Sequence, residues 1–300
     1  MAEYINKYAN DAAIQAAVDG GELIKPYVAY DEAENRIDWN SKTIDYRSMP
    51  LTFEILSDGY INWIANNTAY TVTIEYSKNY GEWTNITSNT SGVHINVVTG
   101  DVVQFRGNNN TYASTTSRYN SFKNTTCNFN LKGNIASLIN STGYTEITAI
   151  TSNYTFVHMF DNCRGLINAD DLILSPIRLS QICYQSMFTN CSSLTTAPAL
   201  PATTLAGYCY DSMFKGCTSL TTVPELPATT LANNCYDAMF QGCISLNYIK
   251  CLATNISATN CTNVWVQSVS SSGTFVTPST TNWSTGNRGI PSGWTRVNSD

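Results

Sequence analysis

The chain has 300 residues, and its charged fraction of 13% is about half of the roughly 25% usual for soluble proteins. With a net charge of −6 and only 16 lysines and arginines, the sequence excludes a nucleic-acid partner, because phosphate binding requires clustered cations. An apolar fraction of 43% is enough for hydrophobic cores, and the length predicts more than one domain. No stretch of about 18 apolar residues occurs, so no membrane span is expected.

The first 48 residues predict a small N-terminal segment. Residues 4–18 favour a short helix that Gly20 and Gly21 end, and residues 24–30 and 35–41 flank Asp-Glu-Ala-Glu as a hairpin. A segment this small cannot form its own core. Either it packs on the next domain, or residues 1–48 anchor the protein to other proteins of a larger assembly. The start of the chain lacks the basic and apolar stretches of a secretory signal, which favours a virion over a secreted protein.

Residues 49–135 predict an all-β domain. Short β-rich runs are separated by Asp-Gly, Tyr-Gly, Ser-Gly and Thr-Gly turns, and Val72, Ile74 and Tyr76 alternate with polar residues. Strands at spacings of about 8–12 residues are typical of a β-sandwich, and we expect an Ig-like one.

Residues 136–262 predict a repeat array. Met-Phe-x-x-Cys begins at positions 159, 187, 213 and 239, in steps of 28, 26 and 26 residues. A period of 26 lies within the range of about 20–29 residues for leucine-rich repeats. Eight cysteines fall on two repeating positions and are interpreted as structural ladders: Cys183, Cys209, Cys235 and Cys261, and Cys163, Cys191, Cys217 and Cys243.

Each repeat predicts a short helix followed by a short strand. Cys209, Met213 and Cys217 lie at i, i+4 and i+8, which would form one apolar stripe on a helix. Asn or Gly precedes the last cysteine in each copy, as at a helix C-terminus. The predicted fold class is therefore multidomain, an all-β Ig-like sandwich followed by an α/β leucine-rich-repeat solenoid. Residues 263–300, with Trp283 and Trp294, predict a C-terminal cap.

The cysteines could serve as zinc ligands, disulfides, a nucleophile or buried packing groups. Zinc sites favour close cysteine pairs or histidines, but the spacing here is eight and the chain has two histidines, His94 and His158. Buried, reduced packing is the favoured interpretation. Oxidation between adjacent repeats outside a cell is left open. No metal or cofactor is expected.

Residues 147–252 resemble the BspA-like leucine-rich repeats of bacterial surface proteins in residue types and in period, as in MFKGCTSLTTVPELPATTLANNCYDAMF. The tail from Trp265 is similar to the segment that caps such repeats. The order of N-terminal segment, Ig-like domain and repeats resembles decoration or fibre proteins on virions of Bacteroides phages, including crAss-like phages. The resemblance implies a surface protein that attaches to a host.

No catalytic motif is present, so we predict no enzyme activity. The regular aromatic row Tyr184, Tyr210 and Tyr236 is a candidate ligand surface, with core packing as the alternative. The expected partners are other virion proteins and a host surface protein or glycan, and a homo-oligomer is compatible with the sequence. Two functions stay open: a non-catalytic virion surface protein, or a bacterial cell-surface adhesin.

Overall fold

The computed structural model describes residues 28–30, 36–38 and 46–299. This part of the chain consists of β-strands, turns and short 3-10 segments, with no α-helix. The N-terminal elements are β1 (Val28–Tyr30), β2 (Arg36–Asp38) and η2 (Tyr46–Ser48). Strands β1 and β2 pair antiparallel where a hairpin was predicted. The helix predicted over residues 4–18 lies outside the described residues.

Two sheets form the front of the molecule. Their elements are β3 (Leu51–Ile55), β4 (Gly59–Ala65), β5 (Thr73–Lys78), β6 (Thr84–Thr87), β7 (Val93–Val97), β8 (Val102–Arg106), β9 (Ala113–Thr115), β10 (Arg118–Ser121) and β11 (Phe129–Asn134). One sheet has the order β7-β4-β10-β9, and the other includes β6-β5-β8-β3-β11. The alternating apolar side chains of both sheets turn inward, and Phe53, Trp63 and Phe105 are fully buried among the aromatic rings between them.

The larger sheet also includes strands that come after residue 135 in the chain. The described elements that follow β11 in the chain are η3 (Ile135–Leu138), η4 (Tyr144–Glu146), β12 (Leu166–Asn168), β13 (Leu172–Ile173), β14 (Tyr248–Lys250), β15 (Thr274–Thr277) and β16 (Thr295–Asn298). Strand β11 is antiparallel to β3 on one side and parallel to β12 and β13 on the other.

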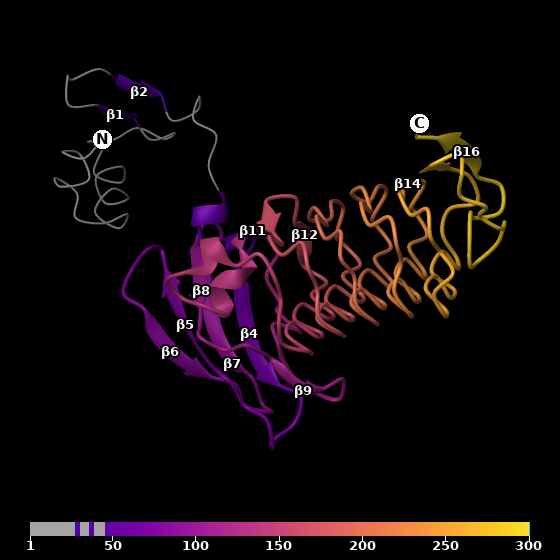
Figure 1. Ribbon diagram of the computed structural model, residues 1–300. Helices are drawn as coiled ribbons and strands as arrows, with labels where there is room; N and C mark the ends of the chain where they lie inside the picture. Colours follow the sequence, from indigo (N-terminus) through magenta and orange to yellow (C-terminus); the bar gives the residue numbers. More distant parts are fainter. Residues whose placement is uncertain (1–27, 31–35, 39–45, 300) are drawn as a thin grey trace.

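Parallel pairing then continues from repeat to repeat. Isolated bridges join Asn168 to Thr196, Thr196 to Thr222 and Thr222 to Tyr248, and β14, β15 and β16 complete the series. Figure 1 shows the result: a row of stacked coils that runs from β11 to the C-terminus. A single mixed sheet therefore connects the front of the molecule to its last strand.

The segment predicted to be a helix is a series of tight turns in every coil. In the second repeat the backbone is left-handed at Ile182, Ser186 and Asn190, one residue in four, with φ of 61°, 55° and 59°. The N–H groups between these positions bond in two alternating directions. Those of Met187 and Cys191 donate to the carbonyl three residues earlier, whereas those of Tyr184, Ser186, Phe188 and Asn190 donate to carbonyls of the next coil, at 2.7–3.0 Å.

This pattern cannot form in a helix, where each N–H donates within its own segment. The predicted fold class, an Ig-like sandwich followed by an α/β leucine-rich-repeat solenoid, is therefore wrong. The described chain is almost entirely β-structure and turns, and its sheets are mixed and antiparallel. Four-residue turns place apolar side chains at i, i+4 and i+8 just as a helix does, which is why the sequence pattern suggested one.

Two columns of aromatic rings run through the core of the stack, with neighbouring ring centroids 5.4–6.1 Å apart. We call them the tyrosine column (Tyr112, Phe156, Tyr184, Tyr210 and Tyr236) and the phenylalanine column (Phe122, Phe160, Phe188, Phe214 and Phe240). Trp63 contacts the first ring of both columns, and Trp265 contacts the last ring of both. The front sheets therefore close one end of the stack, and the C-terminal tryptophans close the other.

Candidate functional site

The tyrosines predicted as a ligand surface lie inside the core. Tyr184, Tyr210 and Tyr236 are at most 2% exposed, and their rings stack on one another at 5.7 and 6.1 Å. Both faces of each ring are covered by the neighbouring coils, so a sugar has no ring to stack against. The reason is the turn geometry, which directs the residue after Cys183, Cys209 and Cys235 inward.

The ladder cysteines are also internal. All ten cysteines are free and buried, and the two predicted columns are present in the stack. In the column that ends each Met-Phe-x-x-Cys motif, each thiol donates to the carbonyl of a phenylalanine-column residue in the preceding layer. The Sγ–O distances are 3.2 Å for Cys163 to Phe122, 3.1 Å for Cys191 to Phe160, 3.2 Å for Cys217 to Phe188 and 3.0 Å for Cys243 to Phe214.

Cysteine suits this position because it is small and apolar yet carries a weak donor. Burial raises the thiol pKa throughout both columns, to about 12 for Cys243 and for Cys235. A buried thiol with a raised pKa is a poor nucleophile and a poor metal ligand. Within the described residues, no three His, Cys, Asp or Glu side chains gather in a way that could hold a metal ion.

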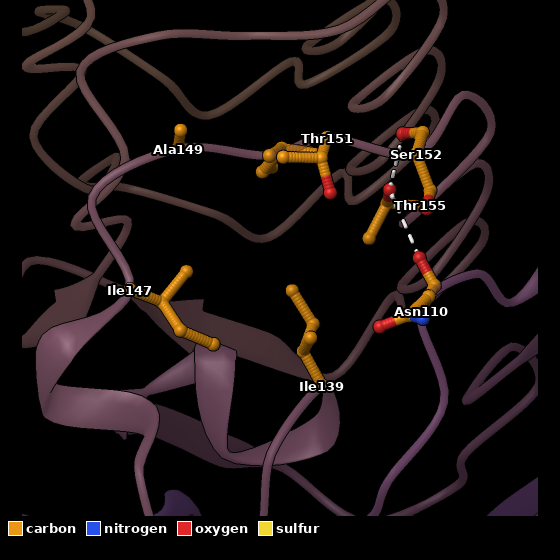
Figure 2. A pocket seen from close by; sticks show the side chains of 8 residues that line it. Asn110, Ile139, Ile147, Ala149, Thr151, Ser152 and Thr155 are labelled. Atoms are coloured by element: carbon orange, nitrogen blue, oxygen red, sulfur yellow. Dashed lines mark hydrogen bonds between the residues drawn. The ribbon is translucent and has the colours of Figure 1, made fainter.

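A pocket of about 150 Å³ opens where the front sheets meet the first coil (Figure 2). Its floor is aliphatic and its mouth is polar. The lining residues are Asn110, Ile139, Ile147, Ala149, Ile150, Thr151, Ser152 and Thr155. The Thr155 hydroxyl, which is buried, donates to the carbonyls of Ser152 and Asn110, so it fastens the first coil to the loop before β9.

Polar side chains form rows on the outer face of the turns. The Gln185 amide donates to Asp211 in the next coil at 2.6 Å, and the Asn263 amide donates to Asp237 at 3.1 Å. Burial raises the pKa of Asp237, and the neighbouring Asp211 raises it further. Because each coil repeats the same backbone, these side chains are held at fixed positions along the stack.

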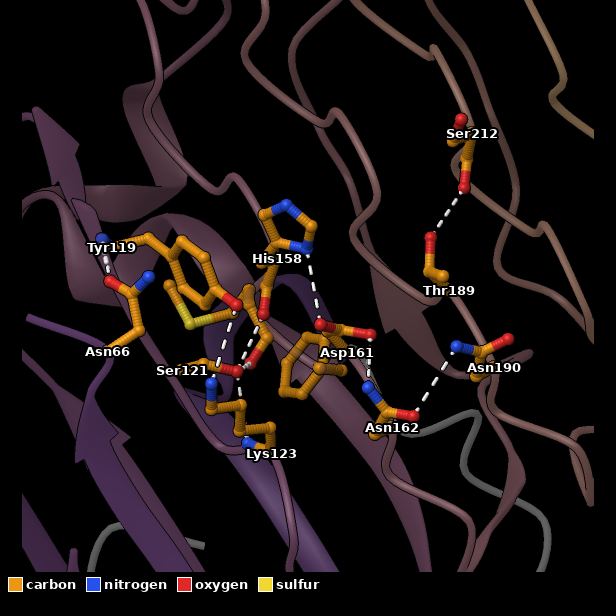
Figure 3. Close-up of polar contacts among 12 residues, drawn as sticks. Asn66, Tyr119, Ser121, Lys123, His158, Asp161, Asn162, Thr189, Asn190 and Ser212 are labelled. Carbon is orange, nitrogen blue, oxygen red and sulfur yellow. Dashed lines mark hydrogen bonds and ion pairs between the residues drawn. The ribbon is translucent and has the colours of Figure 1, made fainter. Parts of the chain in front are cut away.

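A cluster of aromatic and charged groups lies between β10 and the first coil (Figure 3). The imidazole of His158 stacks on the ring of Tyr119, with centroids 4.3 Å apart, and its Nδ1 lies 3.3 Å from an Asp161 carboxylate oxygen. Lys123 lies 5.0 Å from the centroid of the same tyrosine ring. Burial raises the pKa of Tyr119 to about 12, and Asp161 adds to the shift.

The cluster does not have the geometry of a nucleophilic triad. The Ser121 hydroxyl donates to the main-chain carbonyl of His158 at 2.6 Å and is not directed to its ring. An activated serine would need its hydroxyl bonded to an imidazole nitrogen. The Tyr119 ring is buried against His158, and Asn162 and Asn190 extend the polar contacts along the coils.

Sequence reasoning did not single out His158 and Asp161. A signal was available, because these two residues break their repeat columns. The other coils have Ser186, Ser212 and Ala238 at the first position.

No protein-family model matches the chain, and no curated protein and no solved structure is significantly similar to it. The part of the chain that the structure describes contains no helix with the length and apolar character needed to cross a bilayer.

Proposed function

We propose that the protein is a non-catalytic structural and adhesion protein of a phage virion surface, a head fibre or a decoration of the capsid or tail, that attaches to host-surface or mucus glycans. The observation that supports it most is the outer face of the turns, where hydrogen bonds between coils fix polar side chains in a row, as between Gln185 and Asp211 and between Asn263 and Asp237. A rigid, repetitive and weakly charged surface suits a neutral partner. The resemblance of the repeats to BspA-like surface proteins points in the same direction.

A glycan array tests the attachment. The purified chain carries its label on a residue outside the stacked coils. It is applied to an array of neutral and acidic glycans, of mucin type and from bacterial surfaces. We expect binding to a group of related glycans. Absence of any binding at high protein concentration would refute a role in glycan attachment.

Imaging tests the location. Antibody raised against the chain should label the surface of purified phage particles at regular sites, with residues 1–48 as the proposed attachment to other virion proteins. A bacterial cell-surface adhesin is the second candidate, because BspA-like repeats occur on such proteins. Capsid and portal genes beside the coding sequence favour the virion, whereas outer-membrane and secretion genes favour the adhesin.

A further inference from the structure

The pocket between the front sheets and the first coil combines an apolar floor with an uncharged mouth. The aliphatic side chains of Ile139, Ile147 and Ala149 form part of its wall and are partly exposed. No acidic or basic side chain is among the residues that line it. A charged ligand would therefore lose its hydration without gaining a counter-ion, so the pocket favours a neutral one.

Hydrogen-bonding groups at the mouth are free. The side chains of Asn110 and Thr151 are exposed and form no hydrogen bond within the described residues. Figure 2 shows the Thr151 hydroxyl pointing into the hollow and the Asn110 side chain on the opposite side of it, near Ile139. Together they supply donors and acceptors for a ligand that carries hydroxyl groups.

The size of the pocket limits what can enter. Its volume of about 150 Å³ is comparable to that of an engineered apolar cavity that holds benzene. A compact apolar group fills such a space, but a whole disaccharide does not. The occupant must therefore insert a small apolar group and leave its polar part at the mouth.

We propose that this pocket binds a neutral sugar through a methyl group, with the methyl between Ile139, Ile147 and Ala149 and the sugar hydroxyls on Thr151 and Asn110. A 6-deoxyhexose and an N-acetylhexosamine both present this chemistry. The inference rests on the proposed attachment to glycans and names the part of the glycan that is recognised.

Titration of the full chain with simple sugars, followed by NMR or calorimetry, tests the proposal. Fucose and galactose of the same L-series differ only at C6, which is a methyl group in fucose and a hydroxymethyl group in galactose. N-acetylglucosamine is compared with glucose. Because one methyl in an apolar pocket changes affinity by about tenfold or more, the methyl-bearing member of at least one pair should bind at least that much more tightly. The pair that shows the preference identifies the sugar class.

Variants locate the site. Ala149→Leu fills the pocket and should abolish the preference, and Thr151→Ala should weaken binding by several fold. Thr148→Ala is the matched control, since Thr148 is exposed and does not line the pocket. Unchanged thermal unfolding of Ala149→Leu shows that the fold is kept. If Ala149→Leu does not fold, the sugar affinities of Thr151→Ala and Thr148→Ala are compared. Weaker binding in Thr151→Ala alone places the site at the pocket, and equal affinities refute it.

The two proposals fail in different ways. If the wild-type chain binds glycans on the array but shows no methyl preference, or if Ala149→Leu keeps that preference, the pocket is not the site and the attachment function stands. If the wild-type chain binds neither the array nor any of the simple sugars, both proposals are overturned.

Discussion

Tyr184 carries a hydroxyl group to which no described residue bonds. The side chain is fully buried in the tyrosine column, and its hydroxyl oxygen has no hydrogen-bond partner among the described residues. A hydroxyl taken out of water without a partner costs about 1–3 kcal/mol. Tyr184→Phe keeps the ring between Phe156 and Tyr210 and removes only the oxygen. We therefore expect the substitution to stabilise the protein by about 1 kcal/mol.

Tyr112 is the matched control, because it lies in the same column and is equally buried but fully bonded. Its hydroxyl donates to the carbonyl of Leu138 at 2.7 Å and accepts from the Asn109 amide at 3.3 Å. Tyr112→Phe loses both bonds, and we expect it to destabilise the protein by about 1–2 kcal/mol.

Thermal unfolding followed by circular dichroism measures both effects. A change of 1 kcal/mol shifts the Tm by about 2–4 °C in a protein of this size, so the two variants should move in opposite directions. If Tyr184→Phe lowers the Tm as much as Tyr112→Phe does, the reasoning from the unpaired hydroxyl is refuted. Glycan binding should be unchanged in Tyr184→Phe, since the ring is internal.

Three further outcomes follow from the core and from one ion pair. Phe214→Ala removes a ring stacked between Phe188 and Phe240 and should lower the free energy of unfolding in urea by about 3–5 kcal/mol. Tyr208→Ala changes a side chain that is 41% exposed and should alter that free energy by no more than about 0.5 kcal/mol. Equal losses of stability in the two variants would contradict the packing of the phenylalanine column. A thiol reagent at pH 8 should leave the native protein unmodified, because the cysteines are buried and burial raises the thiol pKa, and it should label all ten cysteines after denaturation. Rapid labelling of the native protein would exclude the packing role. Burial raises the pKa of Asp101, but hydrogen bonds from Lys78, Val98 and Asn79 outweigh it and hold the pKa below its ordinary 3.8. The stability from these bonds is present above pH 3.8 and is lost as the pH falls through the lowered pKa. An Asp101→Asn variant should therefore lose less stability than the wild type as the pH falls below 3.8. Parallel acid unfolding curves for the two proteins would contradict this.

The repeat register was predictable because the same residue types recur at a fixed interval in the sequence. The 26-residue step of Cys209 and Cys235 places them in adjacent layers, and the same step brings Tyr210 next to Tyr236. The absence of a helix from each repeat was not predictable in the same way. Periodicity near four residues fits both a helix and a series of four-residue turns, and the bonds that decide between them connect residues in different coils.

Residue type favours the left-handed backbone at some positions of the coils but not at others. Gly216 and Gly242 have φ of 74° and 79°, and Asn162 and Asn190 take the same conformation, as the sequence suggested. The same left-handed geometry also occurs at Ser186, Ser212 and Ala238, where nothing in the residue type favours it. Bonds to the next coil hold those positions, and such non-local bonds leave no mark in a single sequence. The pocket escaped prediction for a similar reason, since Asn110 and Thr151 come together only when the front sheets close the stack.

The two aromatic columns also bear on how long such a molecule can be. Every layer presents one aromatic ring of each column to its neighbour, and Trp63 and Trp265 each contact the end rings of both columns. The ends therefore fit a stack with any number of layers between them. Adding or deleting a 26-residue unit would change the distance between the two ends by about 4.8 Å, the spacing of paired strands, without altering either end. The length of the stack can therefore change in small, equal steps when a 26-residue unit is duplicated or deleted.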